Sequence, residues 1–249
     1  MHVDNPEMIR NLALVGHNDT GKTTLASALL LTSGVVNRLG RVEDGNATTD
    51  FDAEETARGI SLGIGTCFLP WRNHKINLLD TPGYGIFQSE MAAGLRAADA
   101  ALLCINGVSG VEVNSEKAWE VAARFELPVL IHLAKMDRDR ADLERTLESL
   151  QTIFGRQVLP VQLPLGKEQG FTGVVDLLTG QAHTYSRDGN GKGTSGAPPA
   201  EMTDEIALWR GRLIEAVAEA DEALLEKYFE EGTLSDDELR QGLRAAVLR

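Results

Sequence analysis

The sequence is poor in basic charge and in cysteine, and it lacks any long apolar run. Its 249 residues include 24 Lys and Arg against 37 Asp and Glu, a net charge of −13. That balance excludes a domain that grips bare nucleic acid through its own electrostatic field. No apolar run approaches the roughly 20 residues of a membrane span, and the N-terminal MHVDNPEMIR is not built like a secretory signal. We expect a cytoplasmic monomer that contacts no membrane.

The two cysteines, Cys67 and Cys104, lie in the apolar stretches GTCFL and ALLCIN. Such surroundings are typical of buried thiols and not of a disulfide framework. The five histidines are scattered without metal-ligand spacing, so we expect no metal other than magnesium. With 43% hydrophobic residues, the chain can form one large domain or a domain that carries an insert.

Apolar runs bounded by turn residues alternate with helical patterns over the first two thirds of the chain. The candidate strands are 11–16, 66–71, 76–80, 100–106, 128–134 and 158–165. Helices are predicted over GKTTLASALLLTSG ending at Gly34, over NSEKAWEVAARFE with Asn114 as its N-cap, and over DLERTLESLQTIFG ending at Gly155. This alternation predicts an α/β fold with a mostly parallel sheet flanked by helices. The strands 66–71 and 76–80 should form the antiparallel exception.

The pattern changes after residue 165. A short β-like piece, residues 171–185, precedes the Gly- and Pro-rich stretch 186–200, which we expect to be a mobile loop. Beyond it the pattern is helical, with apolar residues at 206, 209, 213 and 217 and a capping box of Ser235 and Glu238. Residues 201–249 hold 13 Asp and Glu against 6 Lys and Arg. This acidic surface is either a solvated face or a docking surface for a basic partner.

The stretch GHNDTGKTT fits the pattern G-x-x-x-x-G-K-[ST] and lies between a predicted strand and a predicted helix. Backbone N–H groups of such a loop surround phosphates, its Lys bridges the outer phosphates and its Thr hydroxyl binds magnesium. The alternative is a glycine turn that matches by chance. The predicted nucleotide-binding residues are Gly16, His17, Asn18, Asp19, Thr20, Gly21, Lys22, Thr23 and Thr24, with Thr23 also a magnesium ligand.

A second motif, DTPGY, follows the strand 76–80. Asp80 would therefore stand at the carboxyl edge of the sheet, where open α/β sheets bind ligands. We expect Asp80 to hold magnesium through water and the Gly83 N–H to meet the γ-phosphate. Taken alone, D-T-P-G is a common turn.

A third motif, AKMD, closes the strand 128–134 and consists of Ala134, Lys135, Met136 and Asp137. Asp137 can accept hydrogen bonds from guanine N1–H and the exocyclic amine, and the Lys135 stem can cover the base. This predicts GTP and GDP as ligands. A P-loop ATPase or kinase remains the alternative if Lys135 and Asp137 do not read guanine.

A fourth stretch, ETARGISLG, reads as a polar loop between a helix and a strand. The hydroxyl of Ser61 could complete the magnesium shell when GTP is bound. On spacing alone, a plain connecting loop explains this stretch equally well.

Together the four stretches resemble the translational GTPases, specifically elongation factor G and its elongation factor G-like relatives. GHNDTGKTT resembles the family's phosphate loop, ARGIS its R-G-I-T switch I, DTPGY its D-T-P-G-H switch II and AKMD its N-K-x-D. Residues 160–182 resemble the start of the insert of elongation factor G. The resemblance implies GTP hydrolysis on the ribosome, with the insert facing the ribosomal stalk protein.

Four departures from the family pattern qualify this expectation. Ser61 replaces Thr but keeps the hydroxyl. Tyr84 replaces the His that orients the attacking water. Because a phenol with a pKa of about 10 cannot take on a proton as readily as imidazole, this replacement predicts slow turnover. The other residues expected to act in catalysis are Lys22 and Gly83. The alternative is that Tyr84 only packs in a mobile loop, and a chain almost without turnover would be a nucleotide-sensing module.

Ala134 replaces the Asn that ties the guanine loop to the phosphate loop, which predicts weaker guanine binding, by about ten- to a hundredfold. The fourth departure is the lack of the family's Ser-Ala loop and of its final strand and helix. We therefore expect a fragment of a longer factor. Residues 1–156 would form the GTPase core without its final strand and helix, and residues 157–249 an incomplete inserted subdomain.

Overall fold

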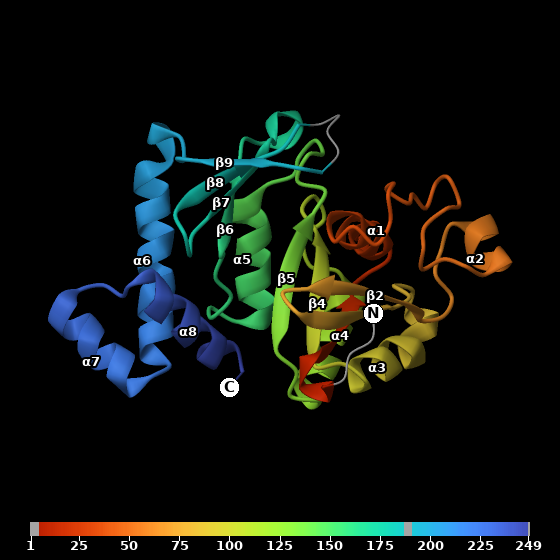
Figure 1. The fold of residues 1–249 in the computed structure, drawn as a ribbon, viewed down its shortest axis with the longest axis horizontal. Helices are drawn as coiled ribbons and strands as arrows, with labels where there is room; N and C mark the ends of the chain where they lie inside the picture. The colour runs from red at the N-terminus through yellow and green to blue at the C-terminus, as the bar shows by residue number, and fades with distance from the viewer. Residues whose placement is uncertain (1–4, 187–190, 249) are drawn as a thin grey trace. The chain divides into compact units, whose positions relative to one another are not determined.

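The computed structural model describes residues 5–186 and 191–248 and divides into two compact units, Met1–Lys135 and Met136–Arg249. The first unit is built on a mixed sheet and the second on a separate antiparallel sheet with its own helices (Figure 1). None of the helices in the described ranges is long and apolar enough to cross a membrane.

The sheet of the first unit has the strand order β2-β3-β1-β4-β5. Its strands are β1 (Ile9–Val15), β2 (Gly65–Trp71), β3 (His74–Asp80), β4 (Ala100–Asn106) and β5 (Val129–Ala134). Strand β1 runs parallel to β3 and β4, β4 runs parallel to β5, and β2 pairs antiparallel with β3. The mostly parallel sheet and its antiparallel exception are confirmed. Arg72 and Asn73, at the tip of the β2–β3 hairpin, both have positive φ, 44° and 65°, as a tight two-residue turn requires.

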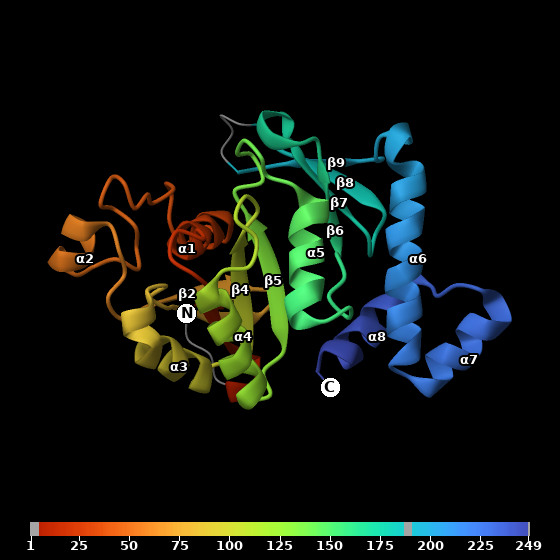
Figure 2. The same cartoon turned by 180° about the vertical axis from the view of Figure 1, so that it is seen from behind.

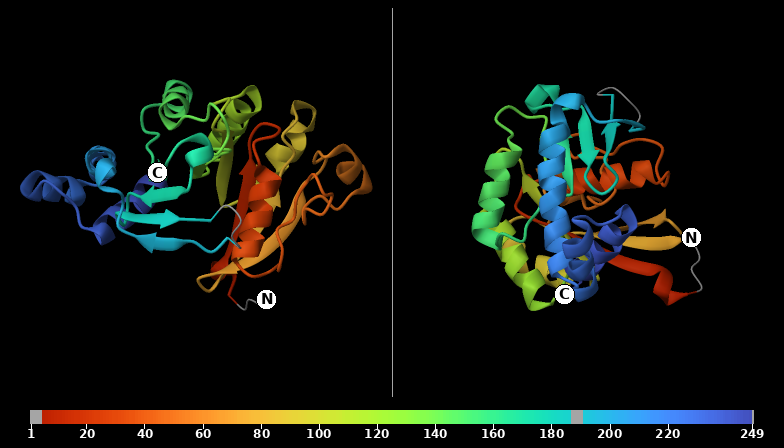
Figure 3. Two further views of the ribbon diagram at one scale, coloured as in Figure 1. Left: turned by 90° about the horizontal axis from the view of Figure 1, so that it is seen from above. Right: turned by 90° about the vertical axis from the view of Figure 1, so that its left-hand side faces the viewer.

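Three helices cover the faces of this sheet: α1 (Lys22–Thr32), α3 (Gln88–Arg96) and α4 (Val113–Arg124). The first unit also contains the short helix α2 (Ala53–Arg58) and the 3-10 turns η1 (Pro6–Met8) and η2 (Gly85–Phe87). Ala26 and Leu30 of α1 pack into one cluster with Leu14, Leu78 and Leu102 of the sheet. Side chains alternate along a strand, so Ala13 and Val15 face the other way. There α3 and α4 pack together against β1 and β4, on the face opposite to α1 (Figure 3).

Three local predictions for the first unit need comment. Helix α1 ends as predicted, with Gly34 directly after the cap residue and in the left-handed conformation. The prediction of Asn114 as the N-cap of α4 was wrong: Glu112 takes that position, and Asn114 lies in the first turn. The stretch 55–63 is not all loop, because its first four residues belong to α2, which Asp52 opens with a capping box to Glu55.

The second unit begins with α5 (Leu143–Phe154), which Asp142 caps and Gly155 ends. An antiparallel sheet follows, in the order β6-β7-β8-β9. Its strands are β6 (Gln162–Leu165), β7 (Gly173–Asp176), β8 (Gln181–Thr184) and β9 (Thr194–Gly196). The remaining elements are η3 (Glu168–Gly170), η4 (Ala200–Met202), α6 (Thr203–Glu219), α7 (Glu222–Glu231) and α8 (Asp236–Val247).

One apolar cluster joins this sheet to the C-terminal helices. Leu163 and Val175 of the sheet pack with Leu213 and Val217 of α6 and with Leu239 of α8, all fully or almost fully buried. Helices α7 and α8 lie against α6 (Figures 1 and 2). The apolar spacing predicted for α6 and the capping box of α8 are both confirmed.

Two predictions for the second unit were only partly right. The strand expected over 158–165 is confined to residues 162–165. The stretch expected to be a mobile loop contains the edge strand β9 over residues 194–196, which pairs with β8. Residues 187–190 of that stretch lie outside the described residues.

Candidate functional site

The loop between β1 and α1, predicted to bind phosphate, turns tightly against the neighbouring strand β4. Gly16 has a φ of +138°, and a Cβ at this position would collide with the carbonyl oxygen of Cys104 on β4. Only glycine therefore allows the chain to turn this close to the neighbouring strand. The Thr20 hydroxyl donates to the His17 carbonyl at 2.9 Å across the loop, and Gly21 occupies the N-cap of α1. The loop N–H groups and the helix N-terminus thus lie where an anion would be held.

Lys22 is directed back into this loop. Its Nζ donates to the carbonyl of His17 at 2.7 Å and to that of Gly16 at 3.3 Å, and the residue is only 7% exposed. Burial lowers the pKa of the Lys22 ammonium, whereas the nearby Asp80 carboxylate acts to raise it. A buried ammonium held by loop carbonyls can exchange one of these contacts for a phosphate oxygen.

Asp80 ends β3 at the carboxyl edge of the sheet, as predicted. Its Oδ2 accepts hydrogen bonds from the hydroxyls of Thr23 at 2.7 Å and Thr49 at 2.8 Å. Burial raises the pKa of the Asp80 carboxyl to about 6, although both hydroxyls and Lys22 act to lower it. The other oxygen, Oδ1, is buried and has no hydrogen-bond partner among the residues that the structure describes. A cation or a cation-bound water would complete this group.

The DTPGY segment reaches the phosphate loop at Gly83. A Cβ on Gly83 would lie 2.6 Å from both the backbone nitrogen of Asn18 and the Nζ of Lys22, so only glycine fits there. The Gly83 carbonyl accepts from the Asn114 side-chain amide at 2.8 Å. The next residue, Tyr84, is 38% exposed. The structure thus brings Gly83 to Lys22 and leaves Tyr84 at the surface.

The first turn of α4 contacts both the phosphate loop and the DTPGY segment. Ser115 Oγ accepts from the His17 backbone N–H at 3.3 Å, and His17 Nε2 lies 3.6 Å from Glu112 Oε1. Asn114, between these two residues, is the group that holds Gly83. Asn114, which was predicted to cap α4, instead joins α4 to the DTPGY segment through Gly83.

Ser61 does not lie beside Asp80 in this structure. Its hydroxyl donates to Asp50 Oδ1 at 3.0 Å, and Glu55 accepts from the backbone N–H groups of Leu62 and Gly63. Burial raises the pKa of the Asp50 carboxyl, and the Ser61 hydrogen bond opposes that shift. Thr49, and not Ser61, supplies the hydroxyl from the segment between α1 and β2 that contacts Asp80.

The AKMD motif begins at the end of β5, next to the phosphate loop. A Cβ built at Gly21 would lie 3.6 Å from the Ala134 Cβ, and the Ala134 carbonyl accepts from the Gly107 N–H at 2.9 Å. Lys135 has a φ of +59°, a left-handed conformation uncommon for a side chain of this kind. Met136 and Asp137 continue the chain in the second unit. Their contribution to a guanine site stays a prediction.

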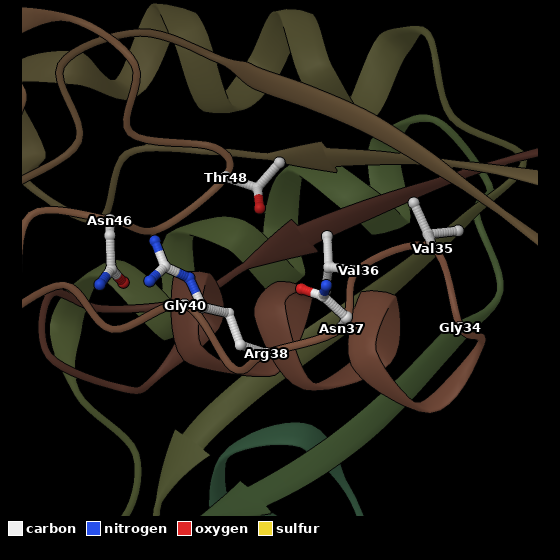
Figure 4. A pocket seen from close by; sticks show the side chains of 8 residues that line it. All are labelled: Gly34, Val35, Val36, Asn37, Arg38, Gly40, Asn46 and Thr48. Carbon is white, nitrogen blue, oxygen red and sulfur yellow. The ribbon is translucent and has the colours of Figure 1, made fainter.

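A hollow of about 410 Å³ lies in the segment that follows α1 (Figure 4). It is lined by Gly34, Val35, Val36, Asn37, Arg38, Gly40, Asn46 and Thr48. None of the residues predicted to bind nucleotide or magnesium belongs to this lining, so the hollow is distinct from the predicted site.

The sequence had indicated neither Thr49 nor Asn114 as a residue of the site. Each acts on a group far away in the chain: Thr49 lies 31 residues before Asp80, and Asn114 lies 31 residues after Gly83. Neither belongs to a motif with characteristic spacing. The single available signal was the run of hydrogen-bonding side chains Thr48, Thr49 and Asp50, four residues before ETARGIS.

Comparison with known proteins agrees with this geometry. Residues 7–237 match the family model of the elongation factor Tu GTP binding domain. Among solved structures, a crystal structure from Thermus thermophilus matches with a TM-score of 0.90 and 39% sequence identity. The match covers 97% of this chain and 36% of that chain, so this chain spans about a third of the length of that protein.

Proposed function

Because the chain belongs to the elongation factor Tu GTP-binding domain family, as a translational GTPase of elongation factor G type, we propose that it binds GTP and GDP with magnesium and hydrolyses GTP slowly. One observation carries the proposal: Lys22, Thr23, Asp80 and Gly83 converge at the carboxyl edge of one sheet. That is the place where open α/β sheets bind ligands.

The residues present fit a magnesium ion. The buried Asp80 Oδ1 lacks a protein partner among the described residues, and the Thr23 hydroxyl hydrogen-bonds the other oxygen of the same carboxylate. An unpaired buried carboxylate oxygen is costly, so a cation-bound water at this oxygen would stabilise the arrangement. When bound, magnesium would neutralise charge on the outer phosphates. Thr23 and Asp80 would hold it, and Ser61 would join only if it leaves Asp50.

The protein groups that would act on the nucleotide are the phosphate loop and Gly83. The N–H groups from Asn18 to Thr24 would bind phosphate oxygens, and the buried Lys22 ammonium would bridge the outer phosphates. Since Gly83 already approaches the Asn18 nitrogen closely, its N–H would meet a γ-phosphate there. Ala134, Lys135, Met136 and Asp137 would form the guanine end of the site, with Asp137 selecting guanine.

Slow turnover follows from Tyr84. The family's water-orienting His is replaced by a phenol, and the side chain is 38% exposed. A phenol is a much weaker base than an imidazole, so its acid–base assistance to the attacking water is weak. The same observation favours a second candidate, a nucleotide-sensing module with almost no turnover.

We propose that residues 1–156 act as the GTPase core and residues 157–249 as an inserted subdomain. The partners would be the ribosome and, for the insert, its stalk protein. The acidic residues of 201–249 would face basic groups of that partner. Binding to the isolated stalk protein that does not change with salt would argue against this docking surface.

Calorimetric titration with GDP, GTP and ATP in magnesium tests the proposal. We expect guanine-selective binding in the micromolar range, which corresponds to about −8 kcal/mol. Equal binding of ATP would refute the guanine assignment and support an ATPase or kinase. Single-turnover hydrolysis, with and without ribosomes, then separates the slow GTPase from the sensing module, because the module would leave GTP intact in both.

A further inference from the structure

Two threonine hydroxyls converge on one oxygen of Asp80. Thr23 comes from the phosphate loop motif, but Thr49 comes from the irregular segment between α1 and α2. Thr49 is 2% exposed and is packed against the start of β2, where a Cβ at Gly65 would lie 2.6 Å from the Thr49 carbonyl oxygen. Its side chain is therefore a buried part of the site.

The two donors restrict the Asp80 carboxylate. Hydrogen bonds of 2.7 and 2.8 Å to the same oxygen, Oδ2, oppose rotation of the group about its last torsion. They also leave Oδ1 as the oxygen without a partner in the described part of the chain. Hydrogen bonds to an ionised acceptor are stronger than those between neutral groups, so this orientation is well defined.

The hydroxyl of Ser61, which follows α2, is held elsewhere. Ser61 donates to Asp50, and Glu55 binds the N–H groups of the two residues that follow Ser61. Asp50 is the immediate neighbour of Thr49. Thr49 therefore binds Asp80, and its neighbour Asp50 binds Ser61.

We propose that Thr49 is a positioning residue of the magnesium site, where its hydroxyl fixes Asp80 so that Oδ1 faces the metal-bound water. This inference rests on the proposed function, since it requires that Asp80 serves magnesium. Thr49 itself touches neither the nucleotide nor the ion in this role. It acts through Asp80, and its loss should weaken metal binding without weakening nucleotide binding in the absence of metal.

The test measures Mn²⁺ binding, by electron paramagnetic resonance, to the GDP complex of the whole chain. Thr49→Val removes the hydroxyl at nearly constant volume, Thr49→Ser retains it, and Thr48→Val is the matched control at the exposed neighbouring threonine. We expect Thr49→Val to weaken Mn²⁺ binding about tenfold, as loss of a hydrogen bond to a charged group implies. Thr49→Ser and Thr48→Val should stay close to the wild-type affinity. GDP affinity in EDTA should be equal in all four chains.

Several outcomes would overturn the inference. Unchanged or tighter Mn²⁺ binding in Thr49→Val would show that the hydroxyl does not position Asp80 for the ion. An equal loss in Thr49→Ser would assign the effect to packing instead of to the hydroxyl. A wild-type chain that binds neither GDP nor Mn²⁺ would refute the proposed function and this inference with it, whereas intact GDP binding with unchanged Mn²⁺ affinity in Thr49→Val refutes the inference alone.

Discussion

Replacing Ala134 with Asn should tighten the binding of GDP. Ala134 ends β5, and its Cβ lies 3.6 Å from the position that a Cβ on Gly21 would occupy. An amide attached to this Cβ would therefore lie within hydrogen-bond reach of the phosphate-loop backbone around Gly21. It would tie the start of AKMD to that loop, as the Asn of the family pattern does.

The magnitude follows from the number of bonds that the amide can make. A net hydrogen bond contributes about 1 kcal/mol, so one or two new bonds should contribute about 1–2 kcal/mol. Because 1.4 kcal/mol corresponds to a factor of ten, we expect the Kd for GDP to fall by about tenfold. Ala134 is only partly buried, so a larger side chain at this position need not push neighbouring groups aside.

The assay is calorimetric titration with GDP in magnesium, and Ala134→Leu is the matched control. Leu adds similar bulk at the same position without a hydrogen-bonding group. If Leu tightens binding as much as Asn, the gain comes from packing. If Asn leaves the Kd unchanged or raises it, position 134 does not face the phosphate loop in the way the 3.6 Å approach implies.

Three further changes have expected outcomes. Tyr84→His should raise single-turnover GTP hydrolysis by about a hundredfold, the lower end of general acid–base catalysis, and an unchanged rate would refute the role assigned to position 84. Gly242→Ala should destabilise the second unit by about 1–3 kcal/mol in urea unfolding, because the new Cβ would lie 2.5 Å from Leu224 Cδ1, whereas Gly211→Ala, with open space, should stabilise it slightly. Hydrogen bonds from Lys227 and then Ser235 lower the pKa of Glu238 to about 2. The unfolded chain therefore binds more protons than the folded one, and stability should fall as pH drops from about 4.5 toward 2. Glu238→Gln should flatten this pH dependence of stability, and a profile parallel to that of the wild type would contradict the prediction.

The strand pattern was predictable from the sequence because its signals are local. Buried strands appear as short apolar runs, and their carboxyl ends are marked directly by Gly16 and Asp80. The antiparallel pair β2–β3 was predictable for the same reason, since its turn has only two residues. Helix ends with a glycine or a capping box, such as Gly155 and Ser235, were equally predictable.

Predictions failed where a side chain had both a local and a distant partner available. Asn114 is a good N-cap residue, but in the fold its amide reaches Gly83, and Glu112 takes the cap position. Residue preferences cannot decide a case such as Asn114, because the distant partner is absent from the local sequence. The short helix α2 is a different case: the capping box of Asp52 and Glu55 that opens it is a local signal, which the prediction of a polar loop overlooked.

The sequence by itself determined the glycine turn after β1, the acid at the end of β3 and the mostly parallel sheet that carries them. Backbone conformation and the spacing of apolar residues are properties of neighbouring residues, so they can be recognised in one chain. Only the tertiary structure decided which hydroxyl reaches Asp80, because Thr49 and Ser61 lie in the same polar segment and both can donate. Packing of Thr49 against β2 and the hydrogen bond of Ser61 to Asp50 place the two hydroxyls on different carboxylates.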